Sequence, residues 1–243
     1  MATWLTHLRV AARITQKLET IVLSPFLVGN LAPDAGRILP DGAYDPAKSV
    51  THFKGRPDRW GFTIGDWTFY RGYLHNGVDV SSSRQMAHWS HMNSFLLGYF
   101  CHLFVDNLWL REFPGLSKHP DTKQALRRID AAYLSASADI HNVSDALLCD
   151  RVPASIQAFL PEPLIQQKVD QVVEAIRHPP RLILSSQDNS PITIQQVNRF
   201  ADCAPRLFGH ALEKLAQGDA MPDDCNSVLA GQGSRAVCNS TSY

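Results

Sequence analysis

The sequence predicts an all-α protein built as one domain. Between residues 3 and 217, most segments repeat apolar residues at the spacing of an amphipathic helix. No segment shows the strict apolar and polar alternation that is typical of a half-buried strand. A length of 243 residues with 44% apolar residues is enough for one large core. We therefore expect a multi-helix bundle.

Local patterns place the helices in order along the chain. The first, residues 3–20, has an apolar stripe made of His7, Ala11, Ile14 and Leu18. A second, short and apolar, begins near residue 21 and ends at the turn signal "APDAG". Further helices are predicted at residues 86–110, 120–135, 162–178 and 192–217. Pro205 is expected to bend the last one, because proline lacks the backbone donor that a helix interior uses.

Two stretches do not follow the helical pattern. Residues 35–84, after the second helix, are rich in Gly, Pro and Asp and carry the aromatic residues Trp60, Phe62, Trp67, Phe69, Tyr70 and Tyr73. A long irregular segment inside a compact domain is typically functional, so we expect a lid or wall over a pocket. Residues 218–243 are rich in Gly, Ser and Asp and are predicted to form a flexible tail after a single domain at 1–217.

Composition excludes several classes of protein. The 23 basic and 23 acidic residues balance to a net charge of zero, which argues against duplex nucleic acid as a partner. No apolar run is long enough to span a bilayer, and the first residues do not form a signal peptide. Five scattered cysteines without a CxxC pair suggest reduced thiols rather than a thiolate zinc site. We expect a cytoplasmic protein without a transmembrane segment, and its oligomeric state stays open.

The central helix contains an ionisable pair in an apolar run. "FLLGYFCHLFVDNLW", residues 95–109, includes His102 and Asp106, which are four positions apart and therefore share one face. Burying a carboxylate costs several kcal/mol unless a cation lies beside it. The pattern thus predicts a metal ion or an arginine next to Asp106. The simpler interpretation is a hydrogen-bonded core histidine and an ordinary ion pair. His91, on nearly the same line, would either orient a ligand imidazole or simply pack.

Other isolated polar residues favour a metal. The tetrad repeats at His141 and Asp145, and three more candidates are His7 on the apolar side of the first helix, Asp34 in "LAPDAG" and His52 in "VTHF". Imidazole and carboxylate ligands without thiolate are typical of hydrolytic zinc, manganese or iron sites, where a carboxylate can bridge two ions. These residues form a candidate multinuclear centre.

The order of these motifs resembles the zinc-dependent phospholipase C family and its relatives, the zinc-dependent single-strand nucleases. The resemblance covers roughly residues 1–150, and the most specific parts are "GNLAPD" and the "LLGYFCHLFVD" helix. It implies an all-helical fold with a cluster of three zinc ions in a cleft. Carried over by position, it assigns one metal to Asp34, His52, His102 and Asp106, a second to His7 with bridging Asp106, and a third to His141 and Asp145.

Two positions depart from that family's pattern. The family begins with a tryptophan whose amino group binds metal, whereas Trp4 here follows "MAT". A histidine is expected shortly after the central tetrad, where this chain has Glu112 and, further on, His119. Glu112 and His119 are therefore additional candidate ligands. We expect one to three zinc ions, with manganese or iron as alternatives.

The leading hypothesis is a zinc-dependent hydrolase of phosphoric esters. It would use a metal-activated water on a small-molecule or lipid phosphodiester or phosphomonoester. Asp34 is the candidate catalytic residue, which would orient or deprotonate that water. The alternative is a non-catalytic helical scaffold or binding protein that holds one structural metal or none. A carboxylate-bridged di-iron bundle fits less well, because such sites use Glu-x-x-His pairs rather than HxxxD.

Overall fold

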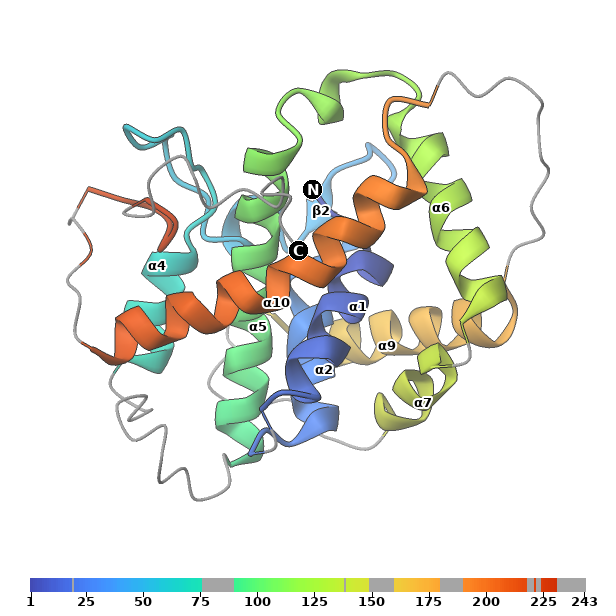
Figure 1. The fold of residues 1–243 in the computed structure, drawn as a ribbon, viewed down its shortest axis with the longest axis horizontal. Helices are drawn as coiled ribbons and strands as arrows, with labels where there is room; N and C mark the ends of the chain where they lie inside the picture. Colours follow the sequence, from blue (N-terminus) through green and yellow to red (C-terminus); the bar gives the residue numbers. More distant parts are fainter. Residues whose placement is uncertain are drawn as a thin grey trace, which may run out of the picture.

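The helix α5 (His91–Glu112) runs through the middle of the molecule, and other helices pack around it (Figure 1). The computed structural model describes residues 1–18, 20–75, 90–137, 139–148, 160–179, 190–217, 221 and 224–230. Most of these residues are helical, and the only sheet among them has two short strands. The all-α prediction is therefore confirmed.

Helices are present wherever the described sequence predicted them. Besides α5 they are α1 (Trp4–Thr15), α2 (Leu23–Leu31), α6 (Thr122–Ala136), α7 (Asp139–Ala146), α9 (Glu162–Arg177) and α10 (Ile194–Ala216). Hydroxyl groups of Thr3, Ser90 and Thr193 accept backbone N–H bonds at the starts of α1, α5 and α10, which satisfies donors that have no partner inside the helix. The helix α10 continues through Pro205.

The closest helix packing joins α2 to α5. A Cβ atom added to Gly98 would lie 2.0 Å from the carbonyl oxygen of Phe26, and one added to Gly29 would lie 2.0 Å from that of Phe95. Only glycine at both positions lets the two backbones approach so closely. From Ser94 to Trp109 every residue of α5 is buried, so this contact lies inside the core.

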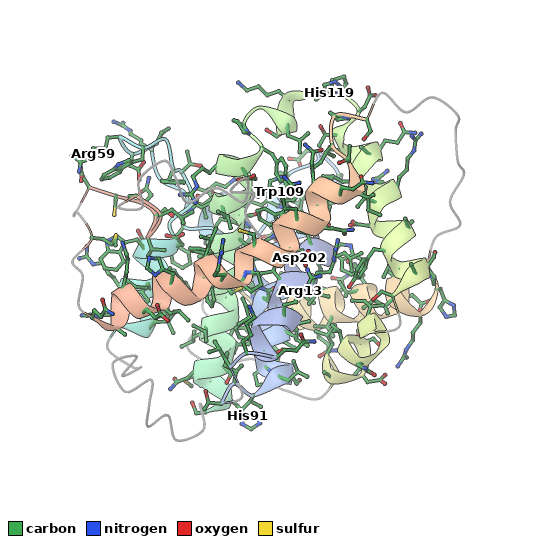
Figure 2. The ribbon with its side chains drawn as sticks, viewed as in Figure 1. Arg13, Arg59, His91, Trp109, His119 and Asp202 are labelled. Atoms are coloured by element: carbon green, nitrogen blue, oxygen red, sulfur yellow. The ribbon has the colours of Figure 1, made fainter. Side chains whose placement is uncertain are left out.

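On the other side of the core, α10 crosses α1 and α5 (Figure 1). Arg13 on α1 and Asp202 on α10 face each other (Figure 2), with 2.6 Å between Nη2 and Oδ1. Deeper in, the rings of Trp109 and Phe200 meet edge to face, 5.0 Å apart. Apolar burial rather than the half-exposed ion pair therefore stabilises most of this crossing.

The segment predicted to be irregular contains short elements. They are the 3₁₀ turn η1 (Ala32–Asp34) that leads into it, the antiparallel strands β1 (Arg37–Ile38) and β2 (Tyr44–Asp45), α3 (Lys48–Thr51), α4 (Asp66–Phe69) and the π-helical turn η2 (Tyr70–Leu74). Its aromatics pack inward as a wall: the ring of Phe69 stacks on that of Tyr99 in α5, 4.5 Å away. Residues 76–84 lie outside the described part of the chain.

Part of the predicted flexible tail is packed against the body of the protein. Residues 224–230 lie on α4 and the loop before it, and Ser227 and Val228 are buried. Both donate hydrogen bonds to the buried carboxylate of Asp66, from Oγ at 2.8 Å and from the backbone N–H at 2.9 Å. These residues are therefore packed rather than extended from the surface, because a buried carboxylate needs hydrogen-bond donors. The flexibility predicted for the tail stays a prediction. The rest of the tail, apart from Met221, lies outside the described residues.

Within the described residues, no helix combines the length and the apolar content that crossing a membrane requires. The described cysteines Cys101 and Cys225 are free thiols, as expected. Cys149 and Cys238 lie outside the described residues.

The α2–α5 contact can be tested by adding one methyl group. We expect Gly98→Ala to lower the free energy of unfolding by about 2–3 kcal/mol, because the backbone of α2 must move to make room. Gly209→Ala in α10, where an added Cβ meets nothing within 4 Å, should stabilise the protein by up to about 1 kcal/mol. Urea unfolding of both variants measures the difference, and equal stabilities would contradict the close approach.

Asp66 should make stability depend on pH. Burial raises the pKa of Asp66 to about 7, although hydrogen bonds from Asn107 and Ser227 lower it in part. The folded chain then binds this proton more tightly than the unfolded chain, where an aspartate titrates near pH ~4. This group therefore makes the free energy of unfolding fall as pH rises from about 4 to 7, by at most about 1.4 kcal/mol per pH unit. Urea unfolding across that range should show this slope in the wild type, and Asp66→Asn should lack it.

Candidate metal centre

Five of the predicted ligands meet around the middle of α5. His7 comes from α1, Asp34 from the end of η1, and His52 from the residue after α3, while His102 and Asp106 lie on α5 itself. All except Asp34 are buried, and the Asp34 side chain is only 15% exposed. Residues that are 99 positions apart in the chain thus converge on one point in the core.

Asp106 is the centre of the group. Its Oδ1 lies 3.3 Å from Nε2 of His7, and its Oδ2 lies 3.5 Å from Nε2 of His52 and 3.7 Å from Nε2 of His102. The backbone N–H of Ala2 also donates to Oδ1, at 3.1 Å. The two oxygens therefore face different imidazoles, which is the arrangement a bridging carboxylate has.

Asp34 forms the outer edge of the group. Its Oδ1 lies 3.6 Å from Nε2 of His52 and accepts a 2.7 Å hydrogen bond from Nζ of Lys48. Lys48 is placed for this by α3, one helical turn before His52. At this edge, the carboxylate of Asp34 faces the buried imidazoles, and the ammonium group of Lys48 lies on its outer side.

Hydrogen bonds at the far ring nitrogens orient the imidazoles. The carbonyl of Asn30 is only an acceptor, so Nδ1 of His102, 2.7 Å away, carries the proton and Nε2 presents a lone pair. Nδ1 of His52 lies 3.0 Å from the hydroxyl of Thr51. The ring of His7 stacks on that of His102, with 3.8 Å between centroids and an angle of 6° between planes. The Nδ1 contacts of His102 and His52 are typical of metal-ligating histidines, whose second nitrogen is held by a neighbour.

Several buried side-chain atoms of these residues have no hydrogen-bond partner in the described part of the structure. They are both ring nitrogens of His7, Nε2 of His52, Nε2 of His102 and Oδ2 of Asp106. Leaving buried polar atoms unpaired is costly, so each requires an explanation. A cation among them would satisfy one nitrogen of each ring together with Oδ2 of Asp106.

The charge states also suit metal ligands. Burial alone would raise the pKa of Asp106, but its contacts with His52 and His7 outweigh burial and hold that pKa well below its usual range. For His102, burial and the neighbouring His7 lower the pKa to about 3, so the ring is neutral. Burial likewise opposes ionisation of Asp34, but nearby positive charge lowers its pKa. Because His102 is neutral, this positive charge is that of Lys48. Ionised carboxylates and neutral imidazoles are the forms that bind metal ions.

The ligand atoms form two overlapping groups, within each of which they lie no more than 4.8 Å apart. One group is His7, His102 and Asp106, and the other is Asp34, His52 and His102. Nε2 of His102 can bind only one ion, because its Nδ1 donates to Asn30. His102 is therefore shared by the two groups, and either group could hold a metal ion. Nitrogen and oxygen donors suit zinc, manganese or iron.

Asp145, the carboxylate of the second HxxxD tetrad, is not part of this group. Asp145 on α7 has a side chain that is 79% exposed, and its Oδ1 lies 3.9 Å from Nη2 of Arg177 on α9. The structure therefore does not bring Asp145 to the ligand group around Asp106, because spacing puts two residues on one helix face but does not decide which face is buried. Its predicted role at a third metal stays a prediction. The side chain of His141 lies outside the described part of the structure.

Glu112 and His119 also lie apart from the centre. Neither completes a group of three close ligand atoms, and the His119 ring is 45% exposed beside Asp121. Figure 2 shows His119 and His91 at opposite ends of the molecule, and His91 is exposed. The roles predicted for Glu112 and His119 as ligands, and for His91 beside a ligand imidazole, are therefore not supported by their positions.

Sequence reasoning missed two residues that complete the centre. Lys48 could have been found, because it lies four residues before His52, as Asp106 lies four after His102. Asn30 contributes only its backbone carbonyl, for which a sequence carries no signal. Comparisons with protein-family models, curated proteins and solved structures found no match. The resemblance to the phospholipase C family consequently stays a prediction.

Removing the carboxylate of Asp106 tests the candidate metal centre directly. We expect Asp106→Asn, which keeps the shape of the side chain, to weaken zinc binding by at least about 100-fold, because it removes the charge that faces three imidazoles. Glu112→Gln and Asp145→Asn are matched controls that should keep the wild-type metal content. Elemental analysis with circular dichroism measures metal and folding, and loss of metal in either control would contradict the assignment.

Proposed function

We propose that this protein is a metal-dependent phosphoric ester hydrolase. The observation that carries the proposal is a buried set of ionised carboxylates and unpartnered imidazole nitrogens that reaches an open pocket through Asp34. That pocket has a volume of about 370 Å³ and is lined by polar and basic side chains. A buried ligand set alone would suit a structural metal, whereas access to a polar pocket is what a hydrolytic site requires.

The proposed roles follow from each residue's position. Asp34, His52, His102 and Asp106 would hold one divalent ion, and His7 with the second oxygen of Asp106 would contribute to another. An ion bound there supplies a water molecule of lowered pKa and positive charge against the phosphate oxygens. The apolar side chains of α5 around His102 and Asp106 keep other water away, which strengthens these charge interactions.

Asp34 is the proposed proton acceptor. It is the member of the group that lines the open pocket, and its carboxylate is ionised. Lys48 fixes one carboxylate oxygen at 2.7 Å, which limits rotation of the side chain. From this position Asp34 would orient the attacking water and take its proton. The order of motifs that resembles the zinc-dependent phospholipase C family supports the same reaction.

An alternative is a helical scaffold or binding protein with a structural metal. It is favoured by the complete burial of His7, His52 and Asp106 and by the hydrogen bond from the N–H of Ala2 to Asp106. Closed coordination is typical of structural sites, while catalytic sites keep one position open. A protein that retains its full metal content and hydrolyses none of the phosphoesters offered would favour this alternative.

Asp34→Asn tests the proposed reaction. Using p-nitrophenyl phosphate and bis(p-nitrophenyl) phosphate at saturating zinc, we expect wild-type turnover and a fall in kcat of at least about 100-fold in the variant, the usual contribution of a general base. The matched control is Asp41→Asn, which removes an exposed carboxylate from the turn between β1 and β2. Full activity in Asp34→Asn with its metal retained would contradict the role of Asp34.

A further inference from the structure

The pocket beside Asp34 has a charge pattern that the metal centre does not require. It lies between η1, the β1–β2 ribbon and α9. It is lined by residues of both signs and by amides, among them Arg37, Lys48, Gln167, Lys168 and Gln171. Its volume of about 370 Å³ is within the roughly 300–1,000 Å³ that is common for small-molecule sites.

Two of the three cations in the pocket are already paired. Lys48 binds Asp34 at 2.7 Å, and Arg37 binds Asp45 with Nη2 at 2.7 Å and Nε at 3.0 Å from one carboxylate oxygen. Within the described part of the chain, Lys168 has no hydrogen bond or ion pair that would neutralise it in the same way. The pocket thus has a surplus of positive charge, and that surplus resides on α9.

Lys168 is not an ordinary surface lysine. Burial lowers its pKa, Asp34 opposes that shift, and Lys48 adds to it, so the ammonium is near both charges of the Asp34–Lys48 pair. A partly buried ammonium without a counterion is unfavourable, and an anion in the pocket would relieve it. Gln167 and Gln171 are one turn apart on α9, and their amide groups can donate to the same anion.

We propose that this pocket binds the phosphate group of an anionic ligand, with Lys168 as its principal contact. Lysine is a common phosphate ligand, acting as a compact point charge with three donors. A cationic ligand would need an aromatic or acidic cage. Among the described lining residues the only aromatic one is Tyr44, whose ring centroid already lies 4.8 Å from Nζ of Lys48. The pocket therefore selects an anionic group over a quaternary ammonium.

The inference deepens the proposed function and rests on it for the reaction. Because Asp34 belongs both to the ligand cluster and to the pocket, an ester bound by Lys168 would have its phosphorus side toward the centre. The substrate class would then be esters that carry a net negative charge at this end. Phosphate binding itself does not depend on hydrolysis, so the two proposals can fail separately.

Isothermal titration with inorganic phosphate tests the pocket in the full-length protein as purified. We expect Lys168→Gln to weaken phosphate binding by about ten-fold or more, the usual effect of losing one charged hydrogen bond, and Lys168→Arg to restore most of it. Arg177→Gln is the matched control: it removes one positive charge from the same helix outside the pocket and should leave binding unchanged. Tetramethylammonium chloride should not bind. Equal phosphate affinity in Lys168→Gln and wild type, or tighter binding of tetramethylammonium than of phosphate, would overturn the proposal.

Two further probes identify the source of the phosphate group. Glycerol 3-phosphate that competes with inorganic phosphate in a Lys168-dependent way would indicate a soluble ester. Lys168-dependent sedimentation with phosphatidylcholine vesicles that contain phosphatidic acid, but not with phosphatidylcholine alone, would indicate a lipid headgroup. Either result supports the pocket, whereas binding of both probes that is unchanged in Lys168→Gln would overturn it.

Kinetics separate this proposal from the hydrolase. If the protein hydrolyses an anionic phosphoester, Lys168→Gln should raise KM about ten-fold and change kcat little, because Lys168 lies outside the ligand set. Lys168-dependent phosphate binding without hydrolysis of any ester would leave the pocket standing and refute the hydrolase. Hydrolysis with an unchanged KM in Lys168→Gln would support the hydrolase and refute the role of the pocket.

Discussion

The contact between α2 and α5 is the constraint on which the rest of the structure depends. Gly29 and Gly98 let the two backbones meet at a distance that no other residue allows. Because of this approach, the carbonyl of Asn30 reaches Nδ1 of His102 and sets which nitrogen of that ring faces the centre. The end of α2 continues into η1 and carries Asp34 to the same place. One backbone contact thus fixes both the tautomer of His102 and the position of Asp34.

A second constraint is electrostatic. Asp106 is ionised although it is fully buried, which costs several kcal/mol unless positive charge compensates it. Lys48 compensates only Asp34, at the outer edge. His102, the nearest partner on the same helix, is neutral. Contacts with His52 and His7 keep Asp106 ionised, and Nε2 of His102 presents a lone pair beside it. A divalent cation is the partner that this arrangement favours.

Side chains of the candidate metal centre become more exposed from the core toward the pocket. His7 and Asp106 are enclosed, whereas Asp34 lies at the boundary and Lys168 lines the open pocket beyond it. A structural metal would need only the enclosed side, and a hydrolytic site needs the boundary as well. On the outer side, the charge of Lys48 helps to keep Asp34 ionised.

The sequence alone determined the fold class, most of the helices and the central pair. Helical periodicity and capping are local, and a spacing of four puts His102 and Asp106 on one face in any helix. The motifs that contain His7, Asp34 and His52 could be recognised in the sequence, although only the packing shows that these residues converge.

Tertiary structure decided what local patterns cannot encode. The tetrad that ends at Asp145 has the same spacing as the central one, yet its carboxylate faces solvent and Arg177 because α7 buries its other face. The docking of residues 224–230 on Asp66 likewise depends on donors about 160 positions away in the chain. The charge of Lys168 lies in the pocket because α9 packs beside η1. Spacing within a helix is a local property, whereas which face is buried, and against what, is set by the packing of distant segments.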